Sequence, residues 1–133
     1  MKILITGANG LLGQKLVGLI GTKPEIDLIA TSRGECRINN LPENVTYESM
    51  DITRPEEVDE IMDKHAPDRV IHTAAMTNVD QCESDHEGCL ALNVDAVRHM
   101  VQACERNDSF LVHVSTDFIF DGEDGVFCIK LRA

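Results

Sequence analysis

The chain has 133 residues, enough for one domain, and its core must be largely aliphatic because 43% of the residues are hydrophobic but only 4% are aromatic. A formal net charge of −11 argues against nucleic-acid and anionic-membrane partners, which attract basic proteins. No apolar stretch is long enough for a membrane span or a secretion signal, and no cysteine or histidine cluster has metal-ligand spacing. We therefore expect a cytoplasmic protein without a metal site.

The first predicted element is a strand that runs into a glycine-rich turn. An apolar run at residues 3–5 is followed by Gly7, Gly10 and Gly13 and then by helical spacing of apolar residues up to position 20. In dinucleotide-binding turns the first glycine permits a sharp bend, the second leaves room for a pyrophosphate, and the third lets the helix pack closely. This order of strand, turn and helix favours a pyrophosphate site at the helix N-terminus over an ordinary glycine-rich turn.

The second strand is predicted at residues 26–31, before a polar loop at 32–44. Ser32 and Arg33 follow this strand, where such folds meet the adenosine ribose. A guanidinium suits a 2′-phosphate better than a free 2′-hydroxyl, so Arg33 favours NADP(H) over NAD(H). The alternative is that Arg33 is a solvated loop cation.

The third strand, residues 45–50, ends at Asp51 and Ile52. Asp51 can accept a hydrogen bond from an adenine amino group while Ile52 covers the ring, or Asp51 can help to cap the next helix. Thr53 and Glu56 have capping-box spacing, which predicts that Thr53 caps a helix ending before Pro67.

The fourth strand is predicted at residues 69–75 and the fifth at 110–115, with a long amphipathic helix at 90–104 between them. Ala74 and Ala75 are small enough for a cofactor to lie against the backbone, although close helix packing explains them equally well. His72 and His113, within the strands, are interpreted as neutral core histidines.

Strands and helices alternate, which predicts an α/β fold: a Rossmann-type, doubly wound parallel sheet with strand order 3-2-1-4-5. Ligands then bind beyond the carboxyl ends of the strands, between strands one and four. Ser115 and Thr116 stand at the end of strand five, where a hydroxyl can hydrogen-bond to a substrate carbonyl or simply satisfy loop backbone groups.

These landmarks together resemble the extended short-chain dehydrogenase/reductase superfamily, and residues 73–80 and 115–122 resemble its dTDP-4-dehydrorhamnose reductase family. The resemblance covers residues 1–125 and implies reduction of the 4-keto group of a nucleotide-linked deoxysugar with hydride from NAD(P)H. The alternatives are a non-catalytic regulatory subunit of the methionine adenosyltransferase beta type and a nucleotide-sugar epimerase or dehydratase.

The resemblance also implies roles for individual residues. Thr116 would be the catalytic hydroxyl, and Asn93 would support the site from the long helix. The residues assigned to the cofactor site are Gly7, Gly10, Leu11, Leu12, Gly13, Ser32, Arg33, Asp51, Ile52, Ala74, Ala75, Met76, Asn93 and Ser115.

One family feature is missing from the 133 residues. The family's proton donor is a tyrosine with a lysine four residues later, but the only tyrosine here is Tyr47, and Asp51 stands four residues after it. We therefore expect residues 1–125 to form an incomplete NAD(P)-binding domain, truncated after strand five and inactive alone, with an atypical tail at 126–133 and no substrate domain. Its exposed fifth strand is expected either to mediate self-association as a homo-oligomer or to be covered by the tail, folded back through Phe127, Ile129 and Leu131.

Overall fold

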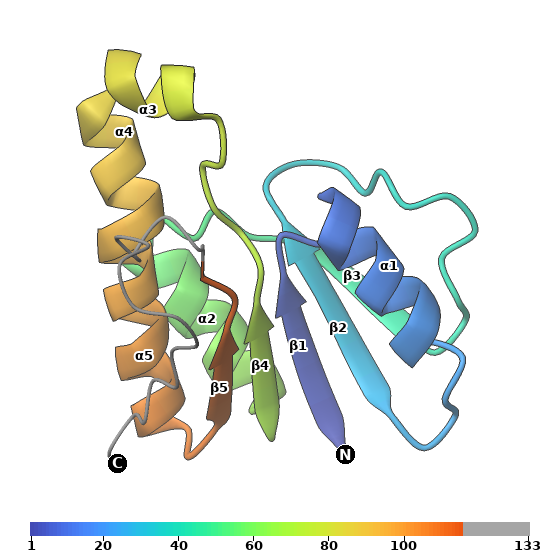
Figure 1. Cartoon of the computed structure of the whole chain (residues 1–133). Helices are drawn as coiled ribbons and strands as arrows, with labels where there is room; N and C mark the ends of the chain where they lie inside the picture. Colours follow the sequence, from blue (N-terminus) through green and yellow to red (C-terminus); the bar gives the residue numbers. More distant parts are fainter. Residues whose placement is uncertain (116–133) are drawn as a thin grey trace, which may run out of the picture.

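The structure is a computed structural model that describes residues 1–115. Five parallel strands form its centre (Figure 1). Their order is β3-β2-β1-β4-β5, which confirms the predicted topology. The chain leaves β1 for β2 and β3 on one side and crosses back to β4 and β5 on the other. The strands are β1 (Lys2–Thr6), β2 (Asp27–Ser32), β3 (Val45–Ser49), β4 (Arg69–His72) and β5 (Phe110–His113).

Helices cover both faces of this sheet, as a doubly wound fold requires. α1 lies on one face, and α2 and α5 lie on the other (Figure 1). None of the helices within residues 1–115 combines the length and apolar character that a bilayer crossing needs. The helices are α1 (Leu11–Ile20), α2 (Pro55–His65), α3 (Val79–Ser84), α4 (His86–Leu90), the π-helical turn η1 (Ala91–Asp95) and α5 (Ala96–Arg106).

The central strand β1 is buried on both faces, because its side chains alternate between two cores. Leu4 belongs to the core formed with α2 and α5, whereas Ile3 and Ile5 belong to the core that contains Val17 of α1. This double burial explains why the strand appears in the sequence as an uninterrupted apolar run.

The turn from β1 into α1 depends on two glycines. Gly7 has φ +70°, and a Cβ on it would lie 2.8 Å from the backbone nitrogen of Ala74, which follows β4. A Cβ on Gly13 would lie 2.2 Å from the carbonyl oxygen of Gly7. The helix therefore packs directly on the turn, and the turn packs directly on the backbone beyond β4.

The predicted capping box at the start of α2 is wrong. Arg54 occupies the N-cap position, while the hydroxyl and N–H of Thr53 both donate to Oδ1 of Asp51, at 2.7 and 3.0 Å. Pro55, with its fixed φ, starts the helix, so Thr53 stays in the preceding turn, where the Asp51 carboxylate is the nearer partner. Glu57 rather than Glu56 accepts a hydrogen bond from the N–H of Asp51, at 2.8 Å.

Three further expectations need correction. The long helix is interrupted by η1, and β4 ends at His72 instead of continuing to Ala75. His72 is fully buried as predicted, but His113 is exposed, because β5 lies at the edge of the sheet within the described residues.

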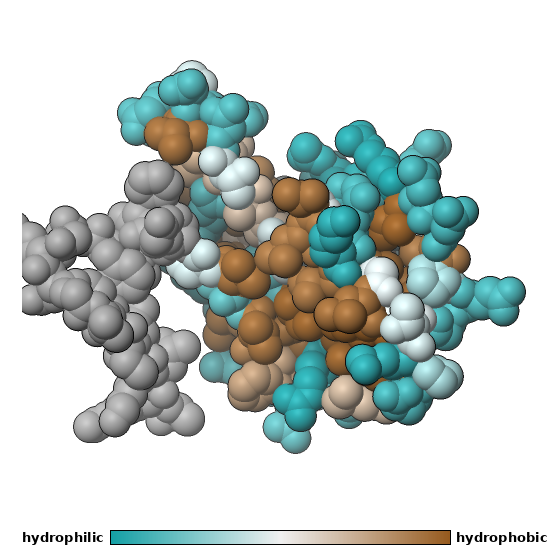
Figure 2. Space-filling model, turned by 45° about the vertical axis from the view of Figure 1, so that its right-hand side comes forward, coloured by the Kyte–Doolittle hydropathy of each residue, from teal (hydrophilic) through white to brown (hydrophobic). Residues whose placement is uncertain are grey.

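Apolar side chains gather across the middle of the surface seen in Figure 2, with polar side chains around them. The exposed apolar residues of the described chain include Phe110, Val112 and Val114 on and after β5. Self-association through this edge remains a prediction, and the alternative, a tail folded over the edge, concerns residues that lie outside the described part of the chain.

Two glycines of α1 provide a matched test of the packing. Gly13→Ala should lower the free energy of unfolding by about 3 kcal/mol, because the methyl group would overlap the Gly7 carbonyl. Gly18→Ala should raise it by about 0.5–1 kcal/mol, because an added Cβ would meet nothing within 4 Å beyond the local helix backbone and alanine favours the helix. Urea unfolding measures both, and equal effects would contradict the close packing.

Candidate functional site

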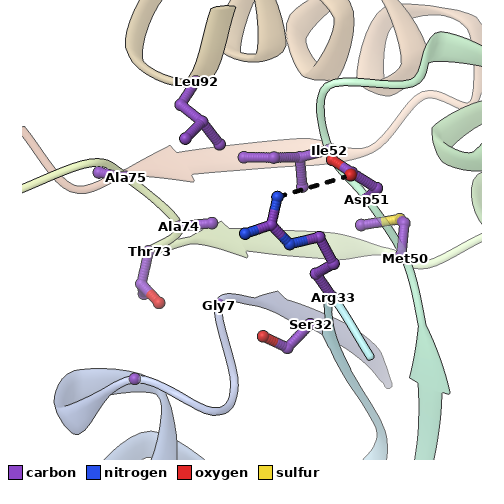
Figure 3. Close-up of a pocket in the computed structure, with 11 residues that line it drawn as sticks. Gly7, Ser32, Arg33, Met50, Asp51, Ile52, Thr73, Ala74, Ala75 and Leu92 are labelled. Atoms are coloured by element: carbon purple, nitrogen blue, oxygen red, sulfur yellow. Dashed lines mark ion pairs between the residues drawn. The ribbon is translucent and has the colours of Figure 1, made fainter. Parts of the chain in front are cut away.

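A pocket of about 260 Å³ opens at the carboxyl ends of the central strands (Figure 3). It lies where the chain order reverses between β1 and β4, the usual ligand position in an open α/β sheet. Eight of the predicted cofactor residues line it, together with Met50, Thr73 and Leu92. The lining residues are Gly7, Gly10, Ser32, Arg33, Met50, Asp51, Ile52, Thr73, Ala74, Ala75 and Leu92.

The glycine turn and the first turn of α1 bound one side of this pocket. The N–H of Gly10 donates to the carbonyl of Gly7 at 2.9 Å, and the N–H of Gln14 begins the helical pattern by donating to Gly10. Among the described residues, Gly10 contributes no side-chain cap and the first turn of α1 contains no acidic residue. The N–H groups of that turn are therefore donors that can meet an anion, aided by the positive end of the helix dipole.

Arg33 and Asp51 face each other across the pocket, with an Nη1–Oδ2 distance of 3.9 Å (Figure 3). Partial burial by itself would raise the pKa of Asp51, but hydrogen bonds from Thr53 and the charge of Arg33 outweigh burial and lower that pKa. Asp51 is therefore a carboxylate that can only accept hydrogen bonds. The Arg33 side chain is 77% exposed, so this ion pair contributes at most about 1 kcal/mol and leaves the guanidinium available to another anion.

The wall beyond β4 is made of backbone and small side chains. Thr73 Oγ1 donates to the carbonyl of Thr6 at 2.7 Å, and Thr6 Oγ1 lies 2.7 Å from Nδ1 of His72. These bonds join β1 to β4 at the pocket edge. Ala74 and Ala75 then present only methyl groups (Figure 3), so an extended ligand has access to the backbone.

Asn93 acts on this wall from outside the pocket lining. Its Oδ1 accepts from the N–H of Met76 at 2.8 Å, and its Nδ2 donates to the carbonyl of Met76 at 3.0 Å. Asn93 lies in η1, and π-helical turns often occur at functional sites. The amide therefore fixes the segment after β4, while its neighbour Leu92 reaches the pocket.

The remaining predicted site residues lie elsewhere. Leu11 and Leu12 are exposed on the first turn of α1, Gly13 is buried beneath the turn, and Ser115 is exposed just after β5. Thr116 lies outside the described residues. No group of three metal-ligating side chains occurs within residues 1–115.

Three lining residues were missed in the sequence. Met50 and Thr73 directly precede predicted site residues at strand ends, so a wider window at each end would have included them. Leu92 had no such signal, because its apolar character was already explained by the amphipathic helix.

Comparison with known proteins gives a consistent result. A family model described as "RmlD substrate binding domain" matches residues 1–129. The chain is 33% identical over 121 residues to dTDP-4-dehydrorhamnose reductase from Aggregatibacter actinomycetemcomitans, which covers 91% of this chain but 36% of that protein. The chain therefore spans about a third of the length of this curated relative.

Two solved structures support the same relationship. A hypothetical dTDP-4-dehydrorhamnose reductase from Sulfolobus tokodaii superimposes with a TM-score of 0.80 at 37% identity, covering 96% of this chain and 44% of that one. The dTDP-4-dehydrorhamnose reductase from Bacillus anthracis in complex with NADP gives a TM-score of 0.69 at 28% identity, covering 93% and 39%.

The buried His72 makes stability depend on pH. Burial, and secondarily the charge of His113, lower the pKa of His72 from 6.5 to about 4. As pH falls, His72 therefore becomes protonated in the unfolded chain at a higher pH than in the folded chain. Between pH 6.5 and pH 4 this difference lowers the free energy of unfolding by about 3 kcal/mol in total. His72→Gln should remove this part of the slope in urea unfolding measured across that range.

The control is His86→Gln, which changes an exposed histidine at the start of α4. It should keep the wild-type dependence on pH. A His72→Gln protein with the wild-type slope would show that His72 takes up its proton equally easily in both states.

Proposed function

The chain belongs to the RmlD substrate binding domain family, and we propose that it forms the nicotinamide-dinucleotide-binding part of a reductase acting on a nucleotide-linked keto sugar. The observation that carries this proposal is one pocket whose lining includes both the glycine turn and the Arg33–Asp51 pair. The family description refers to substrate binding, whereas the described residues supply the features of a dinucleotide site.

The pocket fits a dinucleotide in three respects. Gly7 and Gly10 present no side chains to the pocket, so a pyrophosphate can approach the N–H groups of α1. Ile52 offers an apolar surface to an adenine ring, and Asp51 offers an acceptor to its amino group. When bound, the nicotinamide would supply or accept a hydride, while the chain itself binds and orients the cofactor.

We further propose a preference for NADP(H). Arg33 is a weakly paired, exposed cation at the end of β2, where the adenosine ribose lies in such folds. A guanidinium binds a phosphate through two charge-assisted hydrogen bonds, which a ribose hydroxyl cannot accept equally well. The relative from Bacillus anthracis was solved with NADP, in line with this choice.

The proposed substrate follows from the relatives. The curated relative from Aggregatibacter actinomycetemcomitans is named dTDP-4-dehydrorhamnose reductase, so we propose the 4-keto group of a nucleotide-linked deoxysugar as the site of reduction. Ser115 and Thr116 supply the hydroxyls proposed to hydrogen-bond to that carbonyl. A hydroxyl there would stabilise the negative charge that develops on the oxygen as hydride arrives.

The chain's only tyrosine does not serve as the proton donor in this proposal. Tyr47 lies in β3, and its hydroxyl is 2.8 Å from the carbonyl of Gly34 and 3.2 Å from that of Ser32. Asp51 rather than a lysine stands four residues later. We therefore propose that these 133 residues alone bind the cofactor without turnover.

Cofactor preference can be tested by calorimetry with NADPH and NADH. Arg33→Ala should weaken NADPH binding by about tenfold, because it removes an exposed charge-assisted contact, and should leave NADH binding nearly unchanged. Arg98→Ala, which removes an exposed arginine of α5 that pairs with Asp95, is the control and should change neither affinity. No binding of either cofactor to the wild-type chain would overturn the assignment of the pocket.

Turnover can be tested separately. The chain, incubated with NADPH and a dTDP-4-keto-6-deoxy sugar, should not oxidise NADPH above the rate without protein, because it lacks the paired tyrosine and lysine. Product formation is followed by chromatography of the sugar nucleotides. Protein-dependent reduction of the sugar would show that another group supplies the proton.

A further inference from the structure

The loop after β2 carries the cation that would select the cofactor but has little structure of its own. Residues 33–37 contain no helix or strand, and all five are exposed. Gly34 adopts φ +79°, which gives the loop a sharp bend. Arg33 therefore keeps its place over the pocket only if other parts of the chain hold this loop.

Asn9 holds the loop from the glycine turn. Its Oδ1 accepts from the N–H of Arg37 at 2.8 Å, and its Nδ2 donates to the carbonyl of Glu35 at 2.9 Å. Asn9 itself stands between Gly7 and Gly10, and Gln14 Nε2 donates to its carbonyl at 2.9 Å. The turn proposed to bind pyrophosphate and the loop proposed to bind the 2′-phosphate are thus joined through one side chain.

Tyr47 holds the same loop from β3. Its hydroxyl donates to the carbonyl of Gly34 at 2.8 Å and accepts from Nδ2 of Asn9 at 3.2 Å. Burial is the largest effect on this phenol and raises its pKa, so the hydroxyl remains a donor at neutral pH. Ser49 Oγ accepts from the N–H of Gly34 at 3.1 Å and completes the attachment.

The groups that these hydrogen bonds use matter for ligand binding. They involve backbone groups of the loop rather than the guanidinium of Arg33, which stays exposed at the pocket. In Figure 1 the connection from β2 to β3 arches over the N-terminal end of α1, beside the glycine turn. A loop held in advance does not have to be ordered when a ligand arrives, so its cation binds more tightly.

We infer that Asn9 and Tyr47 are positioning residues for cofactor choice, which hold Arg33 where it meets a 2′-phosphate and thereby favour NADPH over NADH. This inference rests on the proposed function. A positioning role differs from a general structural role, because loss of a structural residue would weaken the binding of both cofactors alike.

The test uses the 133-residue chain, with calorimetric titration of NADPH and NADH into wild type, Tyr47→Phe and Asn9→Ala. Tyr47→Phe removes one oxygen, and Asn9→Ala removes the link to the turn. Both should reduce the ratio of NADPH affinity to NADH affinity by about five- to tenfold, through weaker NADPH binding. Ser49→Ala, a milder change to the same loop, provides a further variant if either protein fails to fold.

Asn44→Ala is the matched control. The Nδ2 atom of Asn44 also donates to two backbone carbonyls, those of Lys23 and Ile26, both at 3.4 Å, but it precedes β3 at the opposite end of the sheet. This variant should leave the affinity ratio unchanged. An equal change of the ratio in Asn44→Ala would overturn the inference.

A double substitution tests whether Tyr47 acts through Arg33. In an Arg33→Ala chain, Tyr47→Phe should have no additional effect on the ratio, since there is no guanidinium left to position. If Arg33→Ala removes the preference for NADPH but Tyr47→Phe leaves that preference intact, this inference is overturned and the proposed function stands. A wild-type chain that binds neither cofactor would overturn the proposed function and this inference together.

The contact between the two positioning residues has its own spectroscopic signature. Tyr47 is the only tyrosine and the chain has no tryptophan, so ultraviolet absorbance reports the ionisation of this phenol alone. Because the hydrogen bond from Asn9 lowers the pKa of Tyr47, Asn9→Ala should raise that pKa further. An unchanged or lowered pKa would show that the two side chains are not in contact.

Discussion

The close approach of two backbone segments, at Gly7 and Ala74, is the constraint on which the rest of the site depends. A single methyl group on Gly7 would lie 2.8 Å from the nitrogen of Ala74, so the turn after β1 and the segment after β4 are separated by no side chain. Between the turn after β1 and the segment after β4, the pocket is therefore walled by main chain and by small residues. Such walls suit a ligand whose phosphates are bound by N–H groups, because side chains would keep those groups at a distance.

Backbone walls need support, and three sets of polar side chains supply it. Thr6, with its partners His72 and Thr73, joins β1 to β4, and Asn93 holds both the N–H and the carbonyl of Met76. Asn9 and Tyr47 hold the loop after β2 in the same manner. Each set uses a short side chain or a phenol to fix backbone groups, so the pocket keeps its shape without a ligand.

The net charge of −11, taken over the whole chain, opposes the binding of an anionic ligand. Electrostatic screening limits the reach of exposed charges to about 8 Å at physiological ionic strength, so local groups decide. At the pocket these groups are the N-terminus of α1 and the exposed Arg33, whose pairing with Asp51 is too long and too exposed to be strong. Asp51 remains ionised beside them as an acceptor for a neutral donor.

The sequence by itself determined the order of elements, the parallel sheet and most of the pocket, because apolar runs, glycine spacing and strand ends are local signals. Carboxyl ends of parallel strands meet at one edge, so residues following them converge whatever the details of packing. Only the tertiary structure decided that Asn93 reaches Met76 from a π-helical turn, that Leu92 lines the pocket and that Tyr47 holds a loop. These contacts join residues through the packing of separate elements, so no local sequence pattern predicts them.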